Sequence, residues 1–266
     1  MHGWSKSPPA TSRRRSNFAV TFKDHFSGHA ADYAKFRPRY PNELFAYLAS
    51  ISPSRKRAWD CATGNGQAAI ALAAQFDSVI ATDASAKQLL NAPVDQRLQY
   101  RVAAAEKSGL ESHSIDLITV AQALHWFDLA KFFAEVKRVL KPRGILAIWS
   151  YNLVSIAPEI DRIINRFYRE TVGPFWPPER QFVEADYRTI DFPFDEIESP
   201  PFRMETQWIL EQLLGYVRTW SATQKFIAAN KFDPVDQLEN EFADFWQPRD
   251  APRLIAWPLS FRVGRV

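Results

Sequence analysis

Short apolar runs alternate with segments of helical periodicity through the middle of the chain. A short apolar run favours a buried strand, whereas apolar residues spaced three or four apart favour a helix that packs one face. Strands are expected at 58–60, 78–82, 98–103, 115–121 and 145–149, with helices between them at 67–76, 86–90 and 129–140. This alternation with short links predicts an α/β fold, a parallel sheet covered by helices on both faces.

The alternation is absent on either side of this core. Residues 22–50 have a helical pattern that is interrupted at 37–41, where Pro41 is placed to begin a second helix. After Tyr151, a helical stretch at 159–171 leads into a segment rich in proline and aromatic residues, which we interpret as an insertion. A strand at 203–209, helices at 211–230 and 235–246, and a terminal strand at 253–262 complete the predicted order.

These patterns divide the chain into a tail and one domain. Residues 1–17 are rich in Ser, Pro and Arg and contain no acidic residue, so they are expected to be a disordered basic tail. Residues 18–266 are expected to form a single domain. Its parts are a helical flap at 18–50, a core at 55–152, an insertion or lid at 153–202, and C-terminal strands and helices at 203–266.

Composition excludes several classes of protein. With 46% hydrophobic and 24% charged residues among 266, the chain has the balance of an ordinary globular protein. Cys61 is the single cysteine, so no internal disulfide can form, and no Cys/His cluster has zinc-finger spacing. We therefore expect a cytoplasmic protein without a bound metal.

Charge and hydropathy indicate which kinds of binding partner to expect. The net charge of +3 is small, and four basic residues of the tail contribute to it, which disfavours nucleic acid as a partner. The tail has no apolar stretch, so neither a secretory signal nor a membrane span is expected there. The expected partner is a small-molecule substrate, with the protein a monomer or homodimer.

A glycine-containing loop between the first strand and the first helix of the core is the strongest candidate for a ligand site. Gly64 and Gly66 permit a tight turn and a close approach of a ligand to the backbone. Asp83 ends the next strand, where its carboxylate can accept hydrogen bonds from ribose hydroxyls. The same residues satisfy G-x-G-x-x-A with an acid 17 residues after Gly66, so a dinucleotide site also fits. Simpler alternatives are a plain turn and a helix-capping Asp83.

An ordered series of short segments carries a resemblance to a known family. The segments are Tyr33–Pro41, Asp60–Gly66, Asp83–Ser85, Ala104–Glu106, Ala121–Asp128 and Arg138–Gly144. In this order they resemble the class I S-adenosylmethionine-dependent methyltransferases, in particular the small-molecule branch that includes trans-aconitate methyltransferase-like proteins. The resemblance implies a Rossmann-like sheet of seven strands, mostly parallel with an antiparallel last strand, and S-adenosylmethionine as the cofactor. A dehydrogenase would not account for His125 and Trp126.

The resemblance also implies where the cofactor lies. Gly64 and Gly66 would line its methionine and ribose portions, Asp83 would hold the ribose, and Ala105 with Glu106 would flank the adenine. Ala62 stands where the family usually has glycine. The full expected set is Tyr33, Arg37, Asp60, Ala62, Gly64, Gly66, Asp83, Ala84, Ser85, Ala105, Glu106 and Gln122. A guanidinium such as Arg37 can pair with the methionine carboxylate, and the Gln122 amide can orient the same part.

The binding site for the molecule that accepts the methyl group is expected after the fourth strand. His125 could remove a proton from a hydroxyl or amine, whereas a carboxylate acceptor would need no base. Trp126 could form a wall for the sulfonium, or simply pack in the core. Expected substrate contacts are Tyr151, Asn152, Arg218 and Trp220. The favoured hypothesis is a methyltransferase acting on a small, carboxylated molecule. The alternatives are an NAD(P)-dependent oxidoreductase and a catalytically inactive cofactor-binding protein.

Overall fold

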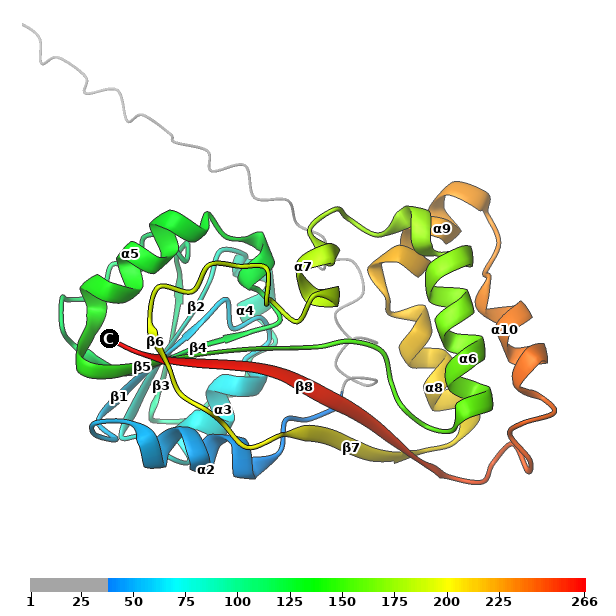
Figure 1. Ribbon diagram of the computed structural model, residues 1–266, viewed down its shortest axis with the longest axis horizontal. Coiled ribbons are helices and arrows are strands. Elements are labelled where there is room, and N and C mark those ends of the chain that lie inside the picture. Colours follow the sequence, from blue (N-terminus) through cyan, green and yellow to red (C-terminus); the bar gives the residue numbers. More distant parts are fainter. Residues whose placement is uncertain (1–37) are drawn as a thin grey trace, which may run out of the picture.

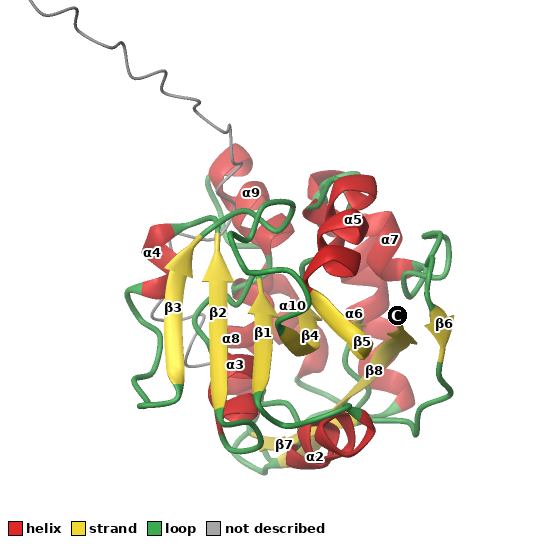
Figure 2. Ribbon diagram, turned by 90° about the vertical axis from the view of Figure 1, so that its left-hand side faces the viewer, coloured by secondary structure: helices red, strands yellow, loops and turns green. Residues whose placement is uncertain are grey.

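A single mixed sheet forms the centre of the structure, a computed structural model that describes residues 38–266. Its strands lie in the order β3-β2-β1-β4-β5-β8-β6, and β7 pairs with β8 beside this path (Figure 2). The strands are β1 (Arg57–Cys61), β2 (Ser78–Asp83), β3 (Leu98–Val102), β4 (Ile115–Ala121), β5 (Leu140–Tyr151), β6 (Asp195–Glu196), β7 (Arg203–Trp208) and β8 (Arg253–Arg265). The expected tail at 1–17 and the first part of the expected flap lie outside the described residues.

The strand directions confirm the expected methyltransferase-like sheet. β1 to β5 pair in parallel, and β8 is antiparallel to β5. The sheet has eight strands where seven were expected, because two separate segments, β6 and β7, pair with opposite ends of the long β8.

Alternate residues of the strands face two different helical layers. Trp59, Ile118 and Ile148 point into a core shared with α5 (Leu129–Val139). Ala58, Leu117 and Ala147 point into a core shared with α2 (Asn42–Ile51) and α3 (Gln67–Ala73). This period of two is what a sheet buried on both faces requires. Figure 1 shows α5 on one side of the sheet and α2 with α3 on the other.

A helical cap extends from one end of the sheet (Figure 1). It consists of α6 (Pro158–Arg166), η2 (Phe167–Thr171), η3 (Gly173–Phe175), α8 (Leu210–Arg218), α9 (Ser221–Asn230) and α10 (Val235–Phe242). The cap has its own apolar core, to which β7 contributes Trp208 and β8 contributes Trp257. Between cap and sheet lies the short helix α7 (Arg180–Glu184).

Several predicted elements differ from the structure in their bounds, and two of these differences change how the elements are divided or paired. The expected helix at 211–230 is two helices, α8 and α9, because Trp220 has extended backbone (φ −65°, ψ 134°) that ends the helical path. This break places the Trp220 side chain in the cap core. The expected strand at 145–149 is the longer β5, because Leu140 already pairs with Ile115. No helix within residues 38–266 combines the length and apolar character needed to cross a membrane.

Candidate functional site

The order of the strands creates a crevice at the carboxyl ends of β1 and β4. From β1 the chain moves outward through β2 and β3, and it then returns to the other side of β1 at β4. Loops leaving β1 and β4 therefore diverge, which is where ligands bind in open α/β sheets. The loop at 62–66 and the short helix η1 (Leu124–Trp126) lie at these two strand ends.

The loop after β1 is built from residues with positive φ. Ala62, Gly64 and Gly66 have φ of 55°, 57° and 81°. At Gly66 a Cβ would lie 2.6 Å from the hydroxyl of Tyr100, so packing requires glycine there. At Gly64 a Cβ would face open space, with no atom within 4 Å. Gly64 is thus the position where a ligand can approach the backbone.

Asp60 supports this loop from inside the protein. Its buried carboxylate accepts hydrogen bonds from the hydroxyls of Thr63 (2.5 Å) and Thr119 (2.7 Å). Burial raises the pKa of Asp60 to about 6, and the two hydroxyl bonds oppose that rise. These hydrogen bonds of Asp60 lie within the protein, where they fix the shape of the loop.

Asp83 connects the loop to the end of β2. Its carboxylate accepts hydrogen bonds from the backbone N–H groups of Gly64 (2.9 Å) and Ser85 (2.8 Å). In open α/β sheets, an acidic residue at the end of this strand accepts hydrogen bonds from ribose hydroxyls. Ser85 is buried and Ala84 is exposed. The open space at Gly64 and the position of Asp83 at the end of β2 both fit a bound nucleoside.

Ala105 and Glu106 lie on the loop after β3, beside these residues. The N–H of Ala103 donates to the carbonyl of Asp83 (3.0 Å), and Glu106 accepts from the N–H of Asp128 (2.9 Å). These two bonds connect the β3 loop to β2 and to the start of α5. The two residues implied for the adenine therefore border the same crevice as Asp83.

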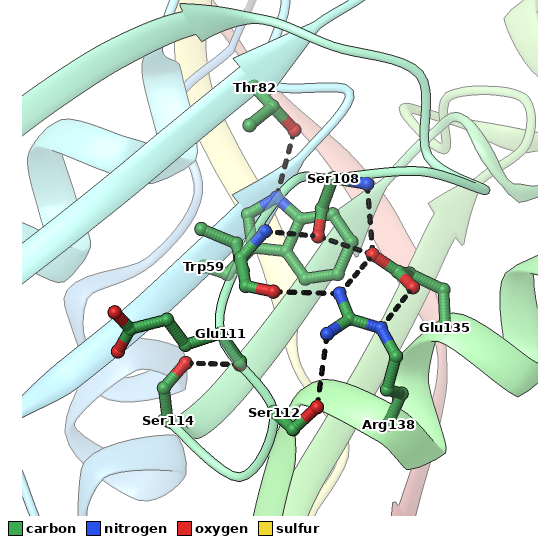
Figure 3. Close-up of polar contacts among 9 residues, drawn as sticks. Trp59, Thr82, Ser108, Glu111, Ser112, Ser114, Glu135 and Arg138 are labelled. Carbon is green, nitrogen blue, oxygen red and sulfur yellow. Dashed lines mark hydrogen bonds and ion pairs between the residues drawn. The ribbon is translucent and has the colours of Figure 1, made fainter.

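An ion pair on α5, between the buried Glu135 and the exposed Arg138, anchors the rest of that loop (Figure 3). Glu135 accepts hydrogen bonds from the N–H of Ser108 (2.9 Å) and from its hydroxyl (2.5 Å). Arg138 pairs with Glu135 at 2.7 Å and donates to the carbonyl of Leu110 at 2.8 Å. Two backbone groups of the loop, the N–H of Ser108 and the carbonyl of Leu110, are thus satisfied by side chains of one helix.

A small pocket, with a volume of about 100 Å³, lies between the ends of β4 and β5 and the cap. Its lining includes six residues expected from the sequence, namely Gln122, His125, Trp126, Tyr151, Asn152 and Trp220. The other lining side chains, which were not predicted from the sequence, include Tyr168, Trp176, Arg180 and Tyr216. These come from the insertion and the cap, where no periodic pattern or motif indicated a site.

Hydrogen bonds fix two of the expected residues. The Gln122 amide donates to the carbonyl of Tyr151 (3.1 Å), and its own backbone has φ of 57°. The Asn152 amide donates to the carbonyl of Val183 (3.1 Å) and to Asp186 (3.0 Å). Gln122 and Asn152 therefore hold β4, β5 and the α7 region together around the pocket.

His125 is held as a neutral imidazole. Its Nδ1 lies 2.8 Å from the hydroxyl of Tyr187. Burial, followed by the charge of Arg180, lowers the pKa of His125 to about 3, and burial raises the pKa of Tyr187 well above its usual value. Because Tyr187 keeps its proton, we infer that it donates to Nδ1, which leaves the imidazole hydrogen on Nε2.

One expected residue among those the structure describes, Arg218, is not in this arrangement. Arg218 does not line the pocket; its guanidinium pairs with Asp233 (2.6 Å) and Asp236 (2.9 Å) within the cap. Tyr33 and Arg37 lie outside the described residues. Among residues 38–266, no group of three or more His, Cys, Asp or Glu side chains is arranged to hold a metal ion.

Comparisons with known proteins agree on one family. A model described as "Methyltransferase domain" matches residues 59–148. A Dictyostelium discoideum protein named as a methyltransferase is 35% identical over 233 residues, which cover 86% of this chain and 89% of that protein. A Saccharomyces cerevisiae protein named as an S-adenosylmethionine-dependent methyltransferase is 28% identical, with 97% and 99% covered. A solved structure from Anaeromyxobacter dehalogenans, named as a type II methyltransferase, is 40% identical with a TM-score of 0.82, covering 86% of this chain and 98% of that one.

Proposed function

Because the chain belongs to the class I S-adenosylmethionine-dependent methyltransferases, we propose that its methyl acceptor is a small molecule and that the attacking atom is a carboxylate oxygen. Family membership gives the enzyme class and the cofactor, and it decides against the NAD(P)-dependent alternative. The pocket beside His125 supports the size of the acceptor and its chemical class.

The observation that carries this proposal is a pocket with hydrogen-bond donors but no effective base. Among its described lining residues there is no carboxylate. With its pKa near 3, His125 is a weak base at neutral pH. A hydroxyl or an ammonium group must lose a proton to attack, whereas a carboxylic acid, with a pKa of about 4, is already ionised. A carboxylate therefore suits what these residues offer.

The reaction then needs little chemistry from the protein. When bound, S-adenosylmethionine supplies a methyl group on a positively charged sulfur. The acceptor oxygen forms the new C–O bond as the C–S bond breaks and its electron pair remains on sulfur, so the products are a methyl ester and S-adenosylhomocysteine, and no proton is released. The protein's contribution is alignment and exclusion of water. Trp126, Trp176 and Trp220 provide apolar walls for that purpose.

The remaining roles follow from position. We assign to Asp83 the binding of the cofactor's ribose, and to Gly64 the place where the cofactor approaches the backbone closely. Ala105 and Glu106 are assigned to flank the adenine. The insertion at 153–202 supplies Tyr168, Trp176 and Arg180 to the pocket, which supports its role as a lid. The pocket volume of about 100 Å³ favours a small metabolite over a folded macromolecule.

Two measurements test the proposal. Calorimetry is expected to detect S-adenosylhomocysteine binding and no comparable binding of NAD. A panel of small carboxylic acids, alcohols and amines, incubated with methyl-labelled S-adenosylmethionine, is expected to yield labelled methyl esters from acids. Transfer only to alcohols or amines would exclude the carboxylate acceptor, and transfer only to proteins or nucleic acids would exclude a small-molecule acceptor.

A further inference from the structure

Arg180 is a positive charge that the fold holds at the wall of the acceptor pocket. It begins α7 and lines the pocket together with His125. Its Nε donates to the hydroxyl of Tyr168 (2.8 Å). Its guanidinium lies over the rings of Trp176 and Tyr168, with the central carbon 4.9 Å and 5.5 Å from the two ring centroids. These contacts fix the orientation of the guanidinium plane.

The charge of Arg180 is not neutralised by a direct ion pair. Within residues 38–266 no carboxylate lies within ion-pair distance of it, whereas Arg218 has two such partners. The Tyr168 hydroxyl, which accepts from Arg180, donates its own proton to Glu184 (2.5 Å), so one neutral group links the two charges. Toward residues 38–266, Nη1 and Nη2 donate no hydrogen bond, which leaves donors of the guanidinium available to a ligand.

The same geometry disfavours a cationic acceptor. Aromatic walls can bind an ammonium group through their faces. Here the rings of Trp176 and Tyr168 already face a guanidinium, and a second cation in the pocket would be repelled by it. An anion instead gains both the charge and the planar donor pattern of Arg180.

We propose that Arg180 binds an anionic group of the methyl acceptor and thereby selects acids over neutral or cationic molecules of the same shape. This rests on the proposed methyl transfer to a small acceptor and adds the residue that determines its specificity. Tyr168 and Trp176 act as positioning residues, because they hold the guanidinium in place.

Binding and turnover test this separately. Three proteins are compared: wild type, Arg180→Met, and Arg169→Met, which removes a charge from an exposed position of η2. Succinate and its neutral diamide serve as binding probes by ligand-observed NMR with S-adenosylhomocysteine present. Succinate is expected to bind wild type and Arg169→Met about 10–100-fold more tightly than Arg180→Met, the scale of lost charge-assisted hydrogen bonds. The diamide is expected to bind all three alike.

Turnover of the best acid in the acceptor panel gives the second readout. Arg180→Met is expected to raise KM for that acid about 10–100-fold, with S-adenosylhomocysteine affinity unchanged. Arg180→Lys keeps the charge but loses the planar pair of donors. Its KM for the acid is expected to lie between those of wild type and Arg180→Met. Equal succinate binding by wild type and Arg180→Met would overturn the role of Arg180, even where acids are methylated. Weaker succinate binding in a protein that methylates no small molecule would support the anion site and overturn the proposed function.

Discussion

Asp83 does more at the residue scale than the sequence implied. Besides its assigned ribose contact, it accepts hydrogen bonds from the backbone of Gly64 and Ser85. It therefore couples the shape of the glycine loop to the end of β2. A side chain with both roles affects ligand affinity through direct contact and through the conformation of the loop.

Replacing Asp83 tests whether it affects cofactor affinity in these two ways. Asp83→Ala is expected to weaken S-adenosylhomocysteine binding by about 1.5–3 kcal/mol, the scale of hydrogen bonds lost to a charged group. Calorimetry measures the loss, and a thermal melt reports how much of it comes from loosening the loop. Asp77→Ala, at an exposed position just before β2, serves as the control and should bind normally. Unchanged affinity in Asp83→Ala would remove this residue from the site.

His125 leads to a prediction about pH. Because its folded-state pKa is near 3, His125 stays neutral from pH 5 to 9, and the rate of methyl transfer to a carboxylate is expected to be nearly flat from pH 6 to 8. His125→Gln retains a donor and is expected to lower the turnover number less than 10-fold, well below the usual loss of 10²–10⁴-fold for a general base. A rate that titrates near neutrality in wild type and not in the variant would identify His125 as a base.

The same residue affects stability. A histidine whose folded pKa lies below its usual value of 6.5 stabilises the fold above that value, and this contribution is lost as the pH falls from 6.5 toward 3. The charged and titratable groups around it are Arg180 and Tyr187. In His125→Gln, the unfolding free energy is therefore expected to fall less than in wild type as the pH is lowered below 6.5. Urea melts at pH 4.5 and 7 measure the difference.

The residues predicted from sequence and those that were missed differ in how they reach the site. Asp83 and Gly64 sit at a strand end and in a turn, so local spacing identified them. Arg180, Tyr168 and Trp176 lie in the insertion, where no periodicity assigns a face. Tertiary packing brings them to His125, and no local pattern encodes that approach.

Among the elements, the loop after β3 is held by side chains of one helix, α5. Glu135 and Arg138 of α5 satisfy its backbone groups (Figure 3). The Arg138 guanidinium, followed by Ser108, holds the pKa of Glu135 at about 2, below its usual 4.5. The stabilisation is thus present above pH 4.5 and is lost as the pH falls toward 2.

Glu135→Gln tests that contribution. The variant is expected to lose about 1–3 kcal/mol of unfolding free energy at pH 7, because Arg138 and Ser108 lose a charged partner. The difference from wild type should shrink as the pH approaches 2. Glu111→Gln, in the same loop with an exposed side chain, is the control. A constant difference at every pH would mean that the charge of Glu135 is not what holds the loop.

The elements of the sheet were predictable because each strand and helix has its own period. The boundary between α8 and α9 was not, since the sequence around Thr219 and Trp220 contains no glycine or proline. The cap core determines that break by burying the Trp220 side chain. Similarly, β5 extends past its apolar run because pairing with β4 and β8 sets its length.

At the scale of the whole molecule, β8 links the two apolar bodies. Val263 near its end packs in the sheet core, and Trp257 packs in the cap core, where its indole N–H lies 3.1 Å from the hydroxyl of Tyr216. A strand shared in this way should make sheet and cap unfold together.

Trp257→Ala measures that coupling. Removing this fully buried ring is expected to lower the free energy of unfolding by about 3–5 kcal/mol. The midpoint is expected to fall in a single cooperative transition. Leu254→Ala on the same strand, 49% exposed, is the control and should change stability little. A second transition, with the cap melting before the sheet, would show that the two bodies are independent.

The shared strand also limits how this enzyme can be re-engineered. The cap supplies walls of the acceptor pocket, yet two of the strands that enter its core, β7 and β8, pair with each other, and β8 also pairs with β5. Transplanting the cap from another protein would therefore remove the antiparallel edge of the sheet as well. Substrate range is better altered by point substitutions at Trp176 and its neighbours than by exchanging the cap as a cassette.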